Sequence, residues 1–343
     1  MSAIPAASCA AMPARQRPAG VRRAACSLFL AGLVAMAFSA GAQPKYPDRP
    51  VRIVVAYAPG GANDLVARLV AQKLGEELGQ PVVVENKAGA GGIVGTEAVA
   101  RAQPDGYTLL LGAGGAITIN PSIYPSLPYD PQRDFAPISR VATSALVAVV
   151  NPSLPVHSVP ELVAWANRQA DGISVASPGT GTPLHLAAEM ARSMAGFRMT
   201  HVPYKGSAPA LADLMSGQVD AMFDVVGTSL PHIRSGRLRA IGVTSPARDR
   251  SLQDVPTLDE QGLKGFDVTV WYGLFAPAKT PEHVLVRLEA AVRKVVASSD
   301  AGERLASMGL SPAADGRDAL ARQVREEIPL WARVVKESGV KAH

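Results

Sequence analysis

Apolar runs and amphipathic stretches alternate along the chain from residue 51 onward. Residues 51–57 (VRIVVAY) are mostly apolar and rich in β-branched side chains, which is typical of a strand covered on both faces. Pro59-Gly60-Gly61 interrupts this run, and apolar residues then recur at helical spacing to about Leu78. Gly79 ends that helix, and residues 81–85 form another apolar run. The pattern predicts a strand–helix–strand unit.

The same order of elements returns further along the chain. Residues 173–177, 178–182, 183–194 and 199–203 repeat the strand, the glycine-containing loop, the helix and the strand. Pro59 corresponds to Pro178, a shift of 178 − 59 = 119 residues. A helix near 92–102 leads into a strand at 107–111, and its counterpart at 209–216 leads into 219–223. Two similar α/β lobes are the economical interpretation.

The remaining segments connect and complete these lobes. We expect residues 145–150 to form a strand that enters the second lobe, and residues 238–244 to form another strand within it. Residues 266–275 would return to the first lobe, and helices at 281–298 and 318–338 would complete it. This assigns 43–144 with 274–343 to the first lobe and 145–273 to the second. Two crossings between lobes make a hinge with a cleft beside it.

The charge of the chain is concentrated at its beginning. The formal net charge is +5, from 34 basic and 29 acidic residues, but residues 1–42 hold four arginines and no acid. Without them the count is 34 − 4 = 30 basic against 29 acidic residues. Cys9 and Cys26 also lie in this segment, so residues 43–343 have no cysteine for a disulfide or a metal site. The remainder shows no basic patch interleaved with aromatic residues, so we expect no nucleic-acid partner.

The first 42 residues have the pattern of a cleavable export signal. Four arginines precede an apolar run at 27–39, and Ala40-Gly41-Ala42 has the small-x-small form of a signal-peptidase site. We expect cleavage before Gln43, after translation from Met1 or Met12. A membrane anchor is the alternative, but the run is shorter than the roughly 20 residues that a spanning helix needs. The expected product is a soluble exported protein.

Two glycine-rich loops are the main candidates for ligand binding. Residues 58–62 and 177–182 each follow a predicted strand and precede a helix, where unpaired backbone N–H groups and the positive end of the helix dipole favour anions. Facing each other across a cleft, they would form an anion pocket without Arg or Lys, and Ser177, Thr180 and Thr182 would add hydroxyl groups. The alternative is that the glycines only close tight turns.

Three further polar residues have two interpretations each. Asp64 either takes part in binding or stabilises the first turn of its helix and pairs with Arg68. His185 either directs a ring nitrogen at the cleft or caps and packs against its helix. Asp224 either meets a ligand's amino group or bridging waters, or caps the helix that begins near Thr228. Aromatic residues at strand ends (Tyr57, Tyr204 and Trp271) would be cleft walls or hinge packing.

Known catalytic and cofactor motifs are absent from the sequence. Residues 89–95 (GAGGIVG) depart from the dinucleotide pattern and follow the second strand of the unit rather than the first. No G-x-S-x-G, H-E-x-x-H or P-loop motif occurs, and no nucleophile–base pair can be identified. We therefore expect neither an enzyme nor a bound cofactor or metal.

Many short motifs lie along the chain, and together they are far more specific than any one of them alone. Those of the first half are Tyr46-Pro-Asp-Arg-Pro50, Ala58-Pro-Gly-Gly61 with Asp64, residues 79–86 (GQPVVVEN), residues 104–109 (PDGYTL), Tyr129-Asp-Pro131 and residues 134–137 (DFAP). Those of the second half are residues 201–206 (HVPYKG), Pro209-Ala-Leu211, residues 217–220 (GQVD), residues 254–257 (DVPT) and Trp271-Tyr-Gly273. Together these motifs resemble those of the Bug family, the periplasmic solute receptors of tripartite tricarboxylate transporters. The resemblance covers essentially all of the chain after the export signal.

This resemblance implies a two-lobed α/β periplasmic binding protein of the type II-like, Venus-flytrap kind, with the duplicated unit and hinge strands described above. It implies a monomer that captures a small mono- or dicarboxylate, or an amino acid, and delivers it to membrane transporter subunits; a sensor kinase is the alternative partner. One departure is Ala56-Tyr57-Ala58, where relatives usually have Pro-Phe-Pro, so the Tyr57 hydroxyl would alter which ligand fits. Carried over by position, the ligand-binding residues are Tyr57, Pro59, Gly60, Gly61, Ala62, Asp64, Ala113, Gly114, Gly115, Ala116, Ser177, Gly179, Thr180, Gly181, Thr182, His185, Tyr204 and Asp224.

Overall fold

The computed structural model describes residues 46–341. The predicted export signal at residues 1–42, with its cleavage before Gln43, lies outside the described residues. Within residues 46–341, no helix combines the length and the apolar character that crossing a membrane requires.

The first predicted repeat is a parallel sheet with helices packed against it. Strand β1 (Val51–Val55) pairs in parallel with β2 (Val82–Asn86) and with β3 (Thr108–Ala113). Between these strands run α2 (Ala62–Leu78), the short η1 (Ala90–Gly92) and α3 (Ile93–Ala100). Helix α2 ends at Gly79, whose φ of 70° is the left-handed conformation that glycine adopts most easily. The predicted strand–helix–strand order is confirmed.

The second repeat has the same construction. Strand β5 (Ile173–Ser177) pairs in parallel with β6 (Met199–Pro203) and with β7 (Ala221–Val225). Helices α6 (Pro183–Ala195) and α7 (Ser207–Ser216) follow β5 and β6, and α8 (Val226–Arg234) follows β7 directly. Helix α5 (Val159–Arg168) precedes this repeat, and β8 (Arg239–Val243) lies after it.

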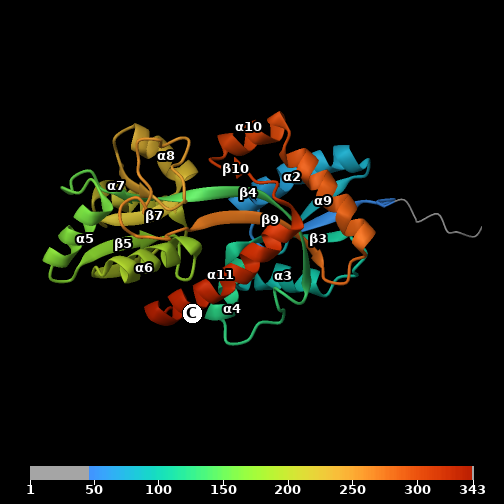
Figure 1. Cartoon of the computed structure of the whole chain (residues 1–343), viewed down its shortest axis with the longest axis horizontal. Helices are drawn as coiled ribbons and strands as arrows, with labels where there is room; N and C mark the ends of the chain where they lie inside the picture. Colours follow the sequence, from blue (N-terminus) through green and yellow to red (C-terminus); the bar gives the residue numbers. More distant parts are fainter. Residues whose placement is uncertain (1–45, 342–343) are drawn as a thin grey trace, which may run out of the picture. The chain divides into compact units, whose positions relative to one another are not determined.

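Two long antiparallel strands connect the repeats, and Figure 1 shows them side by side at the centre. Strand β4 (Phe135–Val150) pairs with β9 (Thr269–Pro277) through residues 135–145 and with β7 and β8 through residues 146–150. The sheet order is β2-β1-β3-β9-β4-β7-β5-β6. The sequence pattern predicts only residues 145–150 of β4 as a strand. The structure adds ten residues before them, because that half of the strand has β9 as its partner.

Short helices and the C-terminal segment complete the fold. The π-helical turn η2 (Gly115–Ile119) and α4 (Asn120–Ile123) follow β3, and α9 (Glu282–Val296), α10 (Ser299–Ser307), β10 (Ser311–Pro312) and α11 (Gly316–Ser338) follow β9. Helix α9 buries Leu288 in the core of the first repeat.

Helix α11 contributes to two separate cores. Its first half buries Leu320 and Val324 beside Trp271 of β9, while Trp331 and Val334 belong to the core around α6 and β5. Figure 1 shows α11 passing along β9 toward the second repeat. The helix therefore contacts both repeats, and the assignment of 43–144 with 274–343 and of 145–273 to separate lobes stays a prediction.

Candidate functional site

A cavity of about 230 Å³ lies where elements of both repeats meet, and we call it the cleft cavity. From the first repeat it is lined by Tyr57, Asn63, Gly114 and Gly115, and from the second by Thr182, Leu184, Ser207 and Val225. Residues 269–272 of β9 and two residues of α11, Glu327 and Trp331, close it from the connecting side. The cavity thus lies between Tyr57 and Asn63, which flank the first predicted glycine-rich loop, and Pro178 and Thr182 of the second.

The N-termini of four helices meet at this cavity. Asn63 lies in the first turn of α2, Thr182 is the N-cap of α6, Ser207 begins α7, and Val225 is the N-cap of α8. The first four N–H groups of a helix have no partner within the helix, and each N-terminus carries a partial positive charge of about +0.5. The arrangement supplies donors and positive potential for an anion.

The charged side chains of the cavity do not include a cation. Among the described residues that line it, none is Lys, Arg or His, and Glu327 is the only ionisable acid. Its carboxylate accepts hydrogen bonds from Trp271 Nε1 (2.9 Å to each oxygen), Thr118 Oγ1 (2.8 Å) and Gln323 Nε2 (2.7 Å). Burial raises the pKa of Glu327, and the three donors oppose this shift because they favour the ionised form.

Aromatic and aliphatic side chains form most of the remaining wall. They are Tyr57, Ile119, Pro178, Pro183, Leu184, Val270, Trp271, Tyr272 and Trp331. Burial raises the pKa of Tyr57 and of Tyr272, so both rings are neutral near pH 7. The Tyr57 ring packs against two glycines that follow later strands. A Cβ at Gly92 would lie 3.2 Å from the Tyr57 hydroxyl oxygen, and a Cβ at Gly115 would lie 3.3 Å from it.

Asp64 holds the first glycine-rich loop in position. Its carboxylate accepts hydrogen bonds from the Gly60 N–H (2.9 Å), Arg68 Nε (2.9 Å) and Asn86 Nδ2 (3.0 Å). The predicted pairing with Arg68 is confirmed. The Arg68 hydrogen bond lowers the pKa of Asp64 to about 2, with burial opposing it. Asp64 is buried away from the cleft cavity, so it acts on the loop rather than on the cavity.

Two stacked histidines support the second glycine-rich loop from behind. The rings of His185 and His201 lie 3.6 Å apart and nearly parallel. His185 Nδ1 accepts a hydrogen bond from the Gly181 N–H (3.1 Å), and His201 Nε2 lies 2.6 Å from Ser177 Oγ. Of the two interpretations of His185, the geometry agrees with capping and packing. Burial lowers the pKa of His201 to about 4.

The contact between Ser177 and His201 is a serine–histidine pair that the sequence pattern does not reveal. Ser177 is only 1% exposed, and its hydroxyl is also within hydrogen-bonding distance of the Gly179 N–H (3.2 Å) and carbonyl (3.1 Å). It does not line the cleft cavity. The pair therefore stabilises the turn of the second glycine-rich loop.

Asp224 lies beneath the cavity wall. It is fully buried, and its carboxylate accepts hydrogen bonds from the hydroxyl groups of Ser207 (3.0 Å), Thr228 and Ser229 (2.8 Å). Burial raises the pKa of Asp224, against the effect of these three hydrogen bonds. The expected capping of a helix beginning near Thr228 is wrong in detail, because α8 begins at Val226, its N-cap is Val225 and no side chain caps it. Asp224 instead contacts hydroxyl groups at the starts of α7 and α8, which is a structural role.

The structure brings five of the predicted binding residues to the cavity wall: Tyr57, Ala113, Gly114, Gly115 and Thr182. The others lie on the same loops or behind them: Pro59, Gly60, Gly61, Ala62, Asp64, Ala116, Ser177, Gly179, Thr180, Gly181, His185, Tyr204 and Asp224. Tyr204 donates a hydrogen bond to Asp213 (2.7 Å), which directs its hydroxyl away from the cavity wall.

Several wall residues are not predicted from the sequence. Ser207 and Val225 follow strands β6 and β7 just as the predicted loops follow β1 and β5, so the repeat itself could have indicated them. Glu327 and Trp331 come from α11, and no local pattern places that helix at the cleft.

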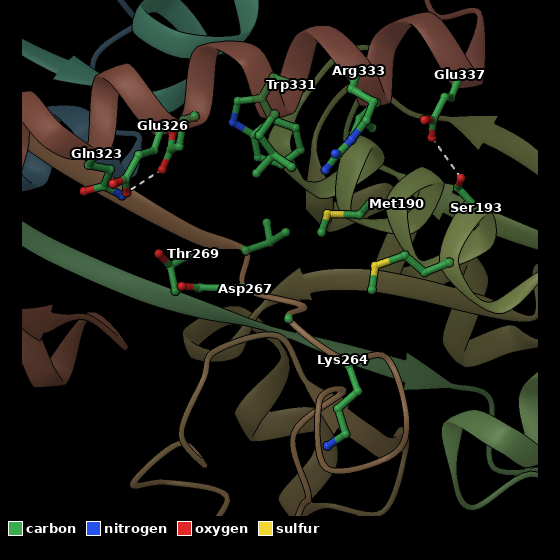
Figure 2. Close-up of a pocket in the computed structure, with 16 residues that line it drawn as sticks. Met190, Ser193, Lys264, Asp267, Thr269, Gln323, Glu326, Trp331, Arg333 and Glu337 are labelled. Atoms are coloured by element: carbon green, nitrogen blue, oxygen red, sulfur yellow. Dashed lines mark hydrogen bonds between the residues drawn. The ribbon is translucent and has the colours of Figure 1, made fainter.

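A second cavity, of about 590 Å³, shares Thr269, Glu327 and Trp331 with the cleft cavity, and we call it the outer cavity. Figure 2 shows it between Met190 and Ser193 of α6, the α11 side chains above, and the segment from Lys264 to Thr269 below. Four carboxylates line it (Asp267, Glu326, Glu327 and Glu337), against two cations (Lys264 and Arg333). This excess of acid makes it less suited to an anion than the cleft cavity.

Within residues 46–341, no cluster of three or more His, Cys, Asp or Glu side chains has a geometry that could hold a metal ion.

Comparison with known proteins agrees with this architecture. Residues 66–340 match the family described as "Tripartite tricarboxylate transporter family receptor" (TctC). A Pseudomonas sp. (strain P51) protein described as "UPF0065 protein in tcbD-tcbE intergenic region" is 40% identical over 299 residues, 87% of this chain and 89% of that protein.

Two solved structures are similar over nearly their whole length. The periplasmic binding protein BugD is 39% identical, with a TM-score of 0.72, over 87% of this chain and 100% of that one. Rpa4515 of R. palustris, solved with adipate, is 33% identical, with a TM-score of 0.75, over 86% of this chain and 99% of that one. The expected two-lobed α/β periplasmic-binding-protein fold is confirmed. The chain belongs to the tripartite tricarboxylate transporter receptor family and is a Bug-type periplasmic solute-binding receptor.

Proposed function

We propose that the chain captures a small carboxylate in the cleft cavity and delivers it to the membrane subunits of a tripartite tricarboxylate-type transporter. The observation that carries this proposal is the meeting of four helix N-termini at a cavity without a basic side chain. Backbone N–H groups at such ends bind carboxylates by hydrogen bonds and by the helix dipole.

Asn63 supports the same proposal. Its Oδ1 is buried and has no hydrogen-bond partner among the described residues, although it lies on the cavity wall. Buried polar atoms are nearly always hydrogen-bonded, so an unsatisfied one at a cavity is explained by a ligand or by water. Oxygen and nitrogen of an amide exchange places when the group turns over, and Asn63 can then offer an N–H to a carboxylate.

Asn63→Asp is a sharp test of this site. The change keeps the size of the side chain but places a negative charge among the N–H groups that would hold the carboxylate. We expect carboxylate affinity to fall at least about tenfold. Folding should not suffer, since an acid in the first turn of a helix is favourable. Titration calorimetry with a panel of mono- and dicarboxylates measures the affinity, and thermal unfolding checks the fold.

Asn167→Asp is the matched control, because Asn167 lies on α5 and is exposed. Undiminished affinity in Asn63→Asp, or an equal loss in both variants, would reject the cleft cavity as the carboxylate site.

The partner and the processing of the chain belong to the same proposal. Residues 1–42 would act as the export signal, with cleavage before Gln43, and the mature receptor would act as a monomer without catalysis. In the alternative, the ligand-bound receptor would bind a sensor kinase instead of a transporter. Co-purification of the ligand-loaded receptor with a membrane permease would support transport. Co-purification with a sensor kinase, and not with a permease, would favour the alternative.

A further inference from the structure

The cleft cavity has two chemically different sides. Its loop side presents the helix N-termini around Asn63, Thr182 and Ser207, while its connecting side holds Glu327 among Trp271 and Trp331. A carboxylate on the loop side meets N–H groups and positive dipole ends. A second carboxylate on the same ligand would have to lie elsewhere in about 230 Å³.

The connecting side offers no cationic partner for a second carboxylate, although the hydroxyl groups of Thr269 and Tyr272 also line it. The donors around Glu327 are already used, since Trp271 Nε1, Thr118 Oγ1 and Gln323 Nε2 all bond to its carboxylate. These donors are neutral, and no Lys, Arg or His forms a salt bridge with Glu327 within the described residues. Arg140, the basic side chain that approaches this region, is hydrogen-bonded to Asp315 and Gln323.

Glu327 therefore has no ion-paired cation on the cavity wall, although the Arg140 charge lies near enough to interact with it. Burial raises the pKa of Glu327, so its negative charge is present only above that raised value. Like charges a few ångströms apart, away from bulk water, repel strongly enough to change affinity by at least an order of magnitude. The rest of this side is apolar and includes flat aromatic surfaces from Trp271, Tyr272 and Trp331. An uncharged ligand body would gain burial there.

We infer that the cleft takes a monocarboxylate with an apolar, preferably flat body, and that Glu327 is the residue that discriminates against a second carboxylate. The inference rests on the proposed function, because it assumes that the first carboxylate is bound at the helix N-termini.

Pairs of ligands that differ only in the second carboxylate test the inference. Benzoate with terephthalate, and hexanoate with adipate, are two such pairs. Titration calorimetry of the mature chain gives the affinity ratio within each pair, and it is repeated at several pH values because burial raises the pKa of Glu327. We expect the monocarboxylate to bind at least about tenfold more tightly in each pair.

Glu327→Gln removes the charge and keeps an oxygen for Trp271 Nε1. We expect the affinity ratio to fall to within about threefold, mainly because the dicarboxylates bind more tightly. Glu326→Gln is the matched control, since Glu326 carries the same charge on the same helix but lines only the outer cavity. That variant should keep the wild-type ratio. Thermal unfolding verifies that both variants are folded.

The outcomes separate this inference from the proposed function. If the dicarboxylates bind as tightly as the monocarboxylates in the wild type, the inference is wrong while the carboxylate receptor stands. If Glu327→Gln keeps the wild-type ratio, Glu327 is not the discriminating residue. If none of the four ligands binds, both proposals fail. The wild-type comparison decides the ligand class even where the Glu327 variant does not fold.

Discussion

Two aspartates near the cleft have opposite environments: Asp64 lies in the first turn of α2, and Asp224 lies near the end of β7. Asp64 is paired with Arg68 and a backbone N–H, which lowers its pKa to about 2, whereas burial raises the pKa of Asp224 among three hydroxyl groups. Neither lines the cleft cavity. Both contact segments at the starts of helices beside the cavity, so we expect their effect on a ligand to be indirect.

Asp224→Ala tests this structural role. The change leaves the hydroxyl groups of Ser207, Thr228 and Ser229 without their common acceptor in a buried place. We expect the free energy of unfolding to fall by about 1–3 kcal/mol. Urea denaturation measures it, with the exposed Asp171→Ala as control. Unchanged stability together with lost ligand binding would instead make Asp224 a direct ligand contact.

His201 predicts a dependence of stability on pH. Burial, followed by the neighbouring His185, lowers its pKa from 6.5 to about 4 in the folded chain. The folded state therefore binds the proton less readily than the unfolded state. The stability contribution is complete above pH 6.5 and is lost as the pH falls toward 4. Because His201 is partly exposed, we expect the free energy of unfolding to fall by about 1–2 kcal/mol over this pH range, which is less than the pKa shift alone would give.

His201→Gln should remove most of this fall in stability at low pH. The urea midpoint should therefore change less between pH 6.5 and about 4 in the variant than in the wild type. The exposed His283→Gln should keep the wild-type profile. A wild-type stability that does not change over this interval would contradict the role given to the stacked histidines.

At the scale of elements, the helices pack on the sheet through glycines at particular points. A Cβ at Gly95 of α3 would lie 2.6 Å from Ala56 Cα and 2.8 Å from the Lys87 carbonyl oxygen, so α3 lies directly against the backbone after β1. Gly302 of α10, in contrast, has no atom within 4 Å of the place that a Cβ would take, and its φ is not positive. The same substitution should therefore have opposite effects at the two positions.

Gly95→Ala should destabilise the chain by about 1–3 kcal/mol, since the contacting atoms are mainly backbone and cannot move aside. Gly302→Ala should stabilise it by about 0.4–1 kcal/mol, because alanine reduces the freedom of the unfolded chain and favours the helix. Thermal unfolding of both variants checks the signs. Equal effects of the two substitutions would contradict the close approach of α3.

The order of elements is largely predictable from the sequence, and their long-range placement is not. Hydrophobic periodicity and glycine breaks indicate α2, α6, α9 and α11 to within a few residues. The extra length of β4 depends on pairing with β9, far away in sequence, and no local signal encodes it. The binding loops follow from the repeat, but the position of α11 at the cleft depends on packing against two cores at once.

At the scale of the whole described chain, the site combines parts that no single segment contains. The two repeats supply helix N-termini, while β9 and α11 supply the aromatic wall and Glu327. The second glycine-rich loop also lies close to α4: a Cβ at Gly181 would lie 2.7 Å from Ile123 Cδ1. Loop geometry on both sides must therefore be correct for a ligand to be enclosed.

The central claim is that a carboxylate binds at the helix N-termini of the cleft cavity. A crystal structure of the mature chain with whichever carboxylate binds most tightly in the titrations tests it most directly. We predict carboxylate oxygens within hydrogen-bonding distance of backbone N–H groups at the starts of α2 and α6, with the ligand body against Trp271 and Trp331. A ligand in the outer cavity, or a carboxylate remote from both helix starts, would contradict this claim.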